Sequence, residues 1–235
     1  MKKIYLSLLI AVCLATLVSA EMLITANPIG QGKWGFAGAY MQDSNLQAGG
    51  LTSLSLTTYG GYAAYGLTDK LDLLLSLGSA TVGNIPATFG GIPMAGSAMS
   101  MTAYGLTAKY TLIDEGTLLP VSVAFGAGYK SVTSSTTNPT IAGGGTTTAN
   151  GSQILAGFGC SKIIIPFVPY AGLMYRSNAS GGSTVSTQLD LTLGTAIAWS
   201  RQGAVLLEYT SQSITPNGGS AYTSGQMAAS VTYTL

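Results

Sequence analysis

The stretch Thr187-Gln-Leu-Asp-Leu-Thr-Leu-Gly-Thr-Ala-Ile-Ala-Trp-Ser200 alternates between apolar and polar side chains. Successive side chains of a β-strand point to opposite faces, so a period of two predicts a strand over residues 186–200. One face of that strand carries small and polar side chains. The other face is apolar except for Thr195. That apolar face carries Leu189, Leu191, Leu193, Ile197 and Trp199.

The same alternation returns along almost the whole chain. It predicts ten strands, and they are long enough for the roughly 9 to 11 residues that a tilted strand needs to cross a bilayer. Glycine, serine, threonine, asparagine and proline fill the segments between them. The predicted strands span residues 33–42, 52–67, 70–81, 98–112, 118–131, 152–164, 167–178, 186–200, 203–213 and 225–235.

The composition places these strands in a membrane. Charged residues make up 7% of the chain, against about 25% in ordinary soluble domains, and the mean hydropathy is +0.41. Beyond the first twenty residues no apolar run approaches the roughly 20 residues of a spanning helix. Only helices and closed barrels satisfy every backbone group inside lipid. The sequence therefore predicts an all-β fold: a single closed antiparallel up-and-down transmembrane β-barrel of about ten strands over residues 33–235, with eight or twelve as alternatives. An exported β-sandwich would carry charges on its outer faces, which are nearly devoid of them here.

The N-terminus has the parts of a secretory signal peptide over residues 1–20. Lys2 and Lys3 precede an apolar run, and Val18-Ser19-Ala20 supplies a small-residue cleavage site. Removing it leaves seven basic and eight acidic residues, a net charge of about −1. Such a balance argues against a nucleic-acid partner. Residues 21–32 are then expected to form a short periplasmic segment before the barrel.

The connections between the predicted strands alternate in length. Those after the even-numbered strands are short, whereas those after the odd ones are longer, and the longest runs over residues 132–151. Outer-membrane barrels have short periplasmic turns and long external loops. This pattern predicts an outer-membrane location with both termini in the periplasm. The external loops are almost free of charge, with Asp43 in the first of them, so a surface adhesin that acts through neutral Gly/Ser/Thr-rich loops is one alternative function.

The second predicted strand does not keep one phase. Its apolar residues are even-numbered at Leu54 and Leu56 but odd-numbered at Ala63, Tyr65 and Leu67. One extra residue in a strand switches the face that follows it, and glycine tolerates the distortion. We therefore expect a β-bulge over residues 58–61.

The last nine residues, 227–235, alternate up to the terminal Leu235. This end resembles the C-terminal signal by which outer-membrane barrels are recognised for assembly, and segments 65–73 and 105–110 resemble strand-turn-strand segments of small outer-membrane barrels. The chain is therefore similar to the small Gram-negative outer-membrane β-barrel proteins of the OmpA and OmpX type. The resemblance implies outer-membrane lipid and the barrel assembly machinery as partners, the latter through the C-terminal strand.

The chain contains no histidine. Histidine-dependent nucleophilic catalysis and the usual transition-metal ligand sets are thereby excluded. Carboxylate chemistry needs two acids within several ångströms, and the predicted barrel separates Asp72, near the periplasmic end, from Asp190, near the external end. We expect no enzyme, and no catalytic residue, metal or cofactor.

Seven charged residues are predicted to face the lumen. Adjacent strands make Asp72 with Lys109, and Arg176 with Asp190, plausible cross-strand pairs. Small inward residues such as Gly78 and Gly128 also leave room for a narrow polar passage. The sequence thus favours a non-enzymatic barrel with a structural role, and a small passive diffusion pore or transporter is the second alternative. The candidate luminal network comprises Lys33, Asp72, Lys109, Lys130, Arg176, Asp190 and Glu208.

Overall fold

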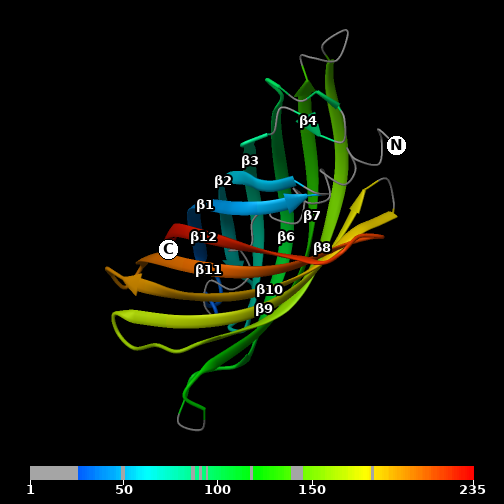
Figure 1. Cartoon of the computed structure of the whole chain (residues 1–235). Helices are drawn as coiled ribbons and strands as arrows, with labels where there is room; N and C mark the ends of the chain where they lie inside the picture. Colours follow the sequence, from blue (N-terminus) through cyan, green and yellow to red (C-terminus); the bar gives the residue numbers. More distant parts are fainter. Residues whose placement is uncertain are drawn as a thin grey trace.

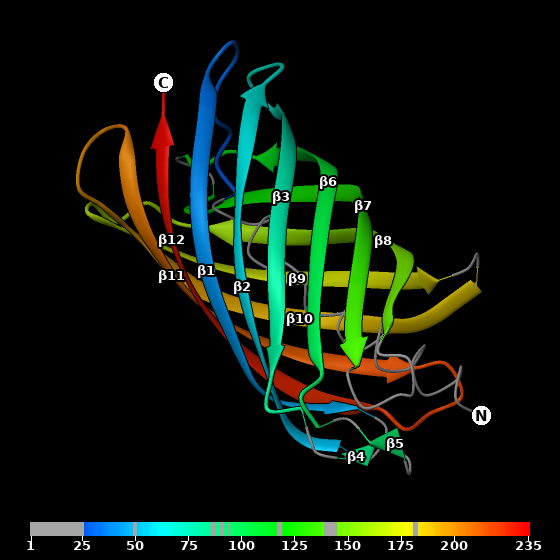
Figure 2. The ribbon, with the colours of Figure 1, turned by 90° about the horizontal axis from the view of Figure 1, so that it is seen from above.

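A computed structural model describes residues 26–48, 51–85, 88–89, 92–93, 95–116, 119–138, 145–180 and 183–235. Ten of its strands form one closed antiparallel barrel, which confirms the predicted fold class and strand number (Figures 1 and 2). Two short strands, β4 (Thr88–Phe89) and β5 (Ile92–Pro93), pair with each other between β3 and β6. The barrel strands are β1 (Trp34–Ala48), β2 (Leu51–Gly66), β3 (Leu71–Gly83), β6 (Ala98–Ile113), β7 (Ser122–Asn138), β8 (Gly145–Ser161), β9 (Phe167–Ser180), β10 (Ser183–Ala198), β11 (Gly203–Pro216) and β12 (Tyr222–Thr234).

The barrel closes where its first strand meets its last. β1 pairs with β12 from Gly35 opposite Thr234 to Ser44 opposite Gly225. Beyond that ladder the amide of Leu235 donates to the carbonyl of Trp34 at 2.7 Å. Closure removes the exposed strand edges that an open sheet would present to lipid. Among the described residues there is no helix long and apolar enough to cross a membrane.

The outer face of the wall is apolar. Leu75 and Leu77 of β3 expose 61% and 66% of their surface, and the leucines of residues 189–193 point outward in the same way. Aromatic pairs flank this band: the rings of Trp34 and Tyr65 lie 4.9 Å apart near the end of the barrel that carries the short turns. Aromatic girdles around an apolar band are typical of transmembrane barrels. The outer face therefore suits a lipid environment.

Leu75 lies between these girdles, so we expect Leu75→Arg to destabilise the barrel by about 2 to 4 kcal/mol. A cation there would lose its hydration to the centre of the bilayer. The free energy of unfolding in lipid vesicles, measured by urea titration, checks this value. Thr81→Arg, at the external end of the same strand and on the same face, is the control and should cost about 0 to 1 kcal/mol. Equal costs for the two variants would contradict the assigned membrane position.

The predicted long loop over residues 132–151 is wrong. β7 continues to Asn138 and β8 begins at Gly145, with an unbroken register from Ser122 opposite Ser161 to Asn138 opposite Gly145. The alternation is hidden there because both faces of the extended hairpin carry threonine and serine. Only residues 139–144 of the expected loop lie outside the described residues.

The assignment of Asp43 to an external loop is also wrong. β1 continues to Ala48, and Asp43 lies within it with none of its surface exposed. Its side chain points into the barrel, since it follows the buried Met41 by two residues. Irregularities in the pairing of β1 with β2 begin only after Ser44.

The bulge expected over residues 58–61 is absent. β2 keeps one register with β3 from Ser55 opposite Gly83 to Gly66 opposite Asp72. Leu54 and Leu56 face the interior rather than lipid, with 2% and 1% of their surface exposed. In β2 the apolar face therefore points inward over the half near Leu54 and outward over the half near Gly66, without any change of phase.

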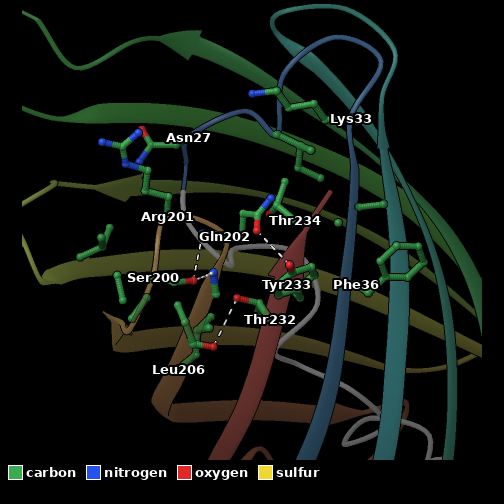
Figure 3. Close-up of a pocket in the computed structure, with 18 of the residues that line it drawn as sticks. Asn27, Lys33, Phe36, Ser200, Arg201, Gln202, Leu206, Thr232, Tyr233 and Thr234 are labelled. Carbon is green, nitrogen blue, oxygen red and sulfur yellow. Dashed lines mark hydrogen bonds between the residues drawn. The ribbon is translucent and has the colours of Figure 1, made fainter.

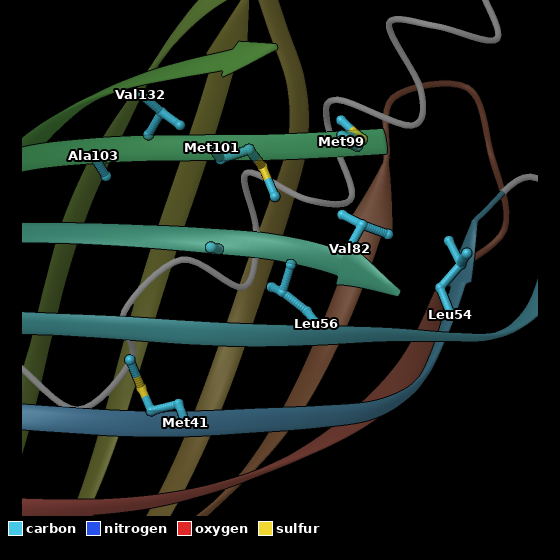
Figure 4. Packing of buried hydrophobic residues seen from close by; sticks show 9 residues of the cluster. Met41, Leu54, Leu56, Val82, Met99, Met101, Ala103 and Val132 are labelled. Carbon is cyan, nitrogen blue, oxygen red and sulfur yellow. The ribbon is translucent and has the colours of Figure 1, made fainter. Parts of the chain in front are cut away.

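These two leucines belong to an apolar cluster inside the half of the barrel away from the short turns (Figure 4). Its members come from five successive strands on one side of the wall, β1, β2, β3, β6 and β7. They are nearly inaccessible to water, so this side of the interior is a packed apolar core. The cluster comprises Met41, Leu54, Leu56, Ala80, Val82, Met99, Met101, Ala103 and Val132.

Candidate functional site

The other side of the interior is polar and is built from the inward faces of β8 to β12. Its centre is an ion pair between Arg176 of β9 and Asp190 of β10, with 2.6 Å between Nε and Oδ2. Gln188 donates to the other carboxylate oxygen at 2.5 Å, and Arg176 donates to Gln153 at 3.4 Å. Neither charged side chain exposes more than 1% of its surface. Charges buried this deeply need such partners.

Neighbouring side chains extend this polar face around the barrel. Gln153 donates to Asn178 at 2.8 Å, and Asn178 donates to Ser186 at 3.0 Å. On the other side of the ion pair, Gln212 of β11 donates to Gln226 of β12 at 3.3 Å. The polar side chains therefore bond to one another and leave little of their surface to water.

Asp43 and Lys130 stand where the polar face meets the apolar cluster. Asp43 accepts a hydrogen bond of 2.7 Å from Ser224, and none of its surface is exposed. Lys130 is buried on β7 and stands opposite Gln153 in the ladder. The sequence missed Asp43 because its polar neighbours resemble a loop.

Glu208 lies on β11 opposite Gly194 of β10. It is buried beside Tyr170. The ring of Tyr170 lies directly over Gly194, the residue opposite Glu208, at a position where a Cβ would overlap it. Tyr170 also packs with Ala196 and Leu206 in a second, smaller apolar cluster.

The segment that precedes β1 enters the end of the barrel that carries the short turns. In Figure 2 the dark-blue chain before β1 turns back at the end where the C-terminus lies. The amide of Ile29 donates to both carboxylate oxygens of Asp72, at 3.3 and 3.2 Å. Lys109 forms an ion pair with Asp72 at 3.0 Å and donates to the carbonyl of Asn27 at 2.8 Å. One buried ion pair therefore anchors this segment in the mouth.

The first described residues of this segment reach the opposite wall. The amide of Ala26 donates to Ser161 of β8 at 3.0 Å, and its carbonyl accepts a 3.0 Å bond from Thr111 of β6. Ser122 of β7 donates to the side chain of Asn27 at 2.5 Å. Residues 26–32, expected as a periplasmic segment, thus fill part of the barrel mouth.

A cavity of about 410 Å³ remains beside this segment. Its inner wall is apolar and includes the inward side chains of Leu74, Ala196 and Leu206. Pro28 and Ile29 of the N-terminal segment form another wall. Two cations from different elements, Lys33 and Arg201, stand at its exposed rim (Figure 3). This size and lining are typical of small-molecule pockets.

The structure divides the predicted luminal network into separate sites. Asp72 with Lys109 lies at the mouth beside the short turns, and Arg176 with Asp190 lies in the opposite half. Both expected cross-strand ion pairs are formed. The remaining members are placed as described above: Lys33 at the cavity rim, Lys130 beside Gln153, and Glu208 beside Tyr170.

Two buried acids, Asp43 and Asp190, lie inside the packed interior with at most 1% of their surface exposed. Within the described parts of the chain, no group of three or more carboxylate, cysteine or histidine side chains is arranged to hold a metal ion.

No model of a known protein family matches this chain, and no curated protein sequence matches it. Similar solved structures are outer-membrane barrels. The translocator domain of the autotransporter NalP from Neisseria meningitidis is 13% identical with a TM-score of 0.53, covering 87% of this chain and 88% of that one. The β domain of the Bordetella autotransporter BrkA is 16% identical with a TM-score of 0.53, covering 86% and 98%. Neisserial surface protein A is 14% identical with a TM-score of 0.42, covering 86% and 95%. The two autotransporter barrels, with TM-scores above 0.5, show that the chain has the fold of an outer-membrane β-barrel.

Proposed function

We propose that this protein is a non-enzymatic barrel of the bacterial outer membrane whose lumen is closed. The observation that carries the proposal is the burial of its interior side chains. Apolar residues pack one half of the external lumen and bonded polar residues fill the other, while the N-terminal segment occupies the periplasmic mouth. Barrels of about eight strands are filled by side chains, whereas wide aqueous channels appear at about 16 to 18 strands. Ten strands are nearer the first case.

A small diffusion pore is the rival that this packing disfavours. The protein in planar bilayers should show no ion conductance above the lipid background. A known porin in the same bilayers controls for insertion, and a step-like conductance from this protein would overturn the closed lumen. The variant Arg176→Gly also tests whether buried side chains close the lumen. Among the described residues it removes the largest fully buried side chain.

The location and orientation belong to the same proposal. Residues 1–20 serve as a cleaved signal peptide, the C-terminal strand engages the barrel assembly machinery, and both termini face the periplasm. Intact-mass measurement on protein from the outer-membrane fraction tests cleavage after Ala20. A tag inserted at the β7–β8 tip should be labelled on whole cells, whereas one at the Arg201 turn should not.

Surface recognition is a second candidate function, and one observation favours it. Residues 145–150 of β8 pair with β7, but the pairing of β8 with β9 starts only at Gly151 among the described residues. An unpaired strand edge is a template for a partner strand. If this hairpin is an adhesive surface, shortening it to Thr133 and Asn150 should abolish cell attachment while the barrel still folds.

A further inference from the structure

We propose that the periplasmic cavity binds a single-chain anionic amphiphile, with a fatty-acid carboxylate as its ligand. This binding activity goes beyond the closed outer-membrane barrel. The cavity combines an apolar interior with cations at its opening, and the two features suit the two ends of such a molecule.

The inner walls supply the site for the tail. Leu74, Ala196 and Leu206 are buried, and Val168 and Ala204 pack against the same small cluster. Pro28 and Ile29 face them from the N-terminal segment. An alkyl chain that enters here exchanges water for apolar contact, which favours binding in proportion to the area removed from water.

The rim supplies the site for the head group. Lys109 also reaches the cavity, but its charge is balanced by Asp72. The charges of Lys33 and Arg201 remain, and among the described residues that line the cavity there is no aspartate or glutamate. Cationic side chains form strong hydrogen bonds with a carboxylate. The hydroxyl of Ser200 and the side-chain amide of Gln202 add polar groups at the same opening.

The end of the cavity limits the length of the tail. Beyond Leu206 the interior is filled by Tyr170 and Glu208 and then by the two packed faces of the external half. The volume of about 410 Å³ fits one medium-length chain and is too small for a two-chain phospholipid. The ligand would therefore enter from the periplasm and remain in the mouth.

Calorimetric titration of the full protein in zwitterionic-lipid nanodiscs tests this inference, with empty nanodiscs as the blank. Octanoate should bind saturably, and hexanoate should bind roughly tenfold more weakly because it buries two fewer methylene groups. The neutral analogue 1-octanol should bind more weakly than octanoate. Lys33→Gln combined with Arg201→Gln should raise the dissociation constant of octanoate by roughly tenfold and leave that of 1-octanol unchanged.

Two variants separate the cavity from the surrounding surface. Ala198→Phe fills the cavity and should abolish octanoate binding, with folding verified by heat-modifiable gel migration. Lys162→Gln removes an exposed cation outside the cavity and should leave binding unchanged.

The proposal fails if octanoate gives no saturable heat above the blank, or if a folded Ala198→Phe protein binds it as the wild type does. The proposal also fails if Lys162→Gln loses as much octanoate affinity as the double variant of Lys33 and Arg201. If the protein conducts ions and still binds octanoate, the closed lumen is refuted and the proposed octanoate site is not.

Discussion

Replacing Arg176 with methionine should destabilise the barrel by about 3 to 5 kcal/mol. Methionine fills much of the same space, but Asp190 would lose the guanidinium that lies 2.6 Å from its carboxylate. With 1% of its surface exposed, Asp190 cannot recover that interaction from water. Urea unfolding of the protein in lipid vesicles, followed by tryptophan fluorescence, measures the loss.

The double variant Arg176→Met with Asp190→Leu distinguishes a lost ion pair from lost packing. Replacing both partners of a buried pair by apolar groups is often nearly neutral, so the double variant should recover most of the stability that Arg176→Met loses. The exposed ion pair of Lys70 with Asp114 is the matched control, and Lys70→Met should cost about 0 to 1 kcal/mol. A double variant as unstable as Arg176→Met would show that the charge of Asp190 is not the cause.

The fold could be predicted because its signals are local. Alternation identifies each strand, and short turns such as that at Arg201 set the order and direction of neighbours. The pairs Asp72 with Lys109 and Arg176 with Asp190 followed from that order. Asp72 stands directly opposite Lys109, whereas Arg176 stands opposite Gln188 and reaches Asp190 diagonally, and both kinds of cross-strand neighbour are within reach of long side chains. Such cross-strand contacts need no knowledge of the rest of the barrel.

The interior was harder to predict because alternation does not identify which face is inside. In the external half of β2 the apolar face points inward at Leu54 and Leu56, and a bulge was the simplest way to keep it in lipid. The actual cause is an apolar core inside the barrel, which depends on side chains from five strands. Asp43 was misplaced for a related reason: strands that continue beyond the bilayer are polar on both faces, and their sequence resembles a loop.

The sequence did not predict that the N-terminal segment, residues 26–32, enters the barrel mouth. Its contacts are made largely by backbone groups, as where the amide of Ile29 meets Asp72 and the carbonyl of Ala26 meets Thr111. Every residue type offers those groups, so composition and spacing do not reveal them. The glycine at position 66 is one trace, because a Cβ there would overlap the carbonyl oxygen of Gly30.

Removing the Asp72 carboxylate should release this N-terminal segment from the mouth. Asp72→Ala deletes both acceptors of the Ile29 amide and leaves Lys109 without its counter-ion. A buried ammonium that loses its partner is strongly unfavourable, and Lys109 regains hydration most simply if the segment above it moves away. In protein that carries Ala26→Cys and Cys160→Ser, labelling by a hydrophilic maleimide should then accelerate at least about tenfold, because a buried thiol reacts only when local opening exposes it.

Two comparisons make this result specific to the anchor. Gln31→Cys, on an exposed residue of the same segment, should label rapidly with or without Asp72→Ala, which controls for the reactivity of the reagent. Lys70→Ala breaks an exposed ion pair at the same mouth and should not accelerate labelling at position 26. If the maleimide labels Ala26→Cys equally slowly with and without Asp72→Ala, the ion pair is not what holds the segment. The hydrogen bonds to Ser161 and Thr111 then hold it. If it does open, octanoate affinity should fall in parallel, since Pro28 and Ile29 would no longer close the cavity.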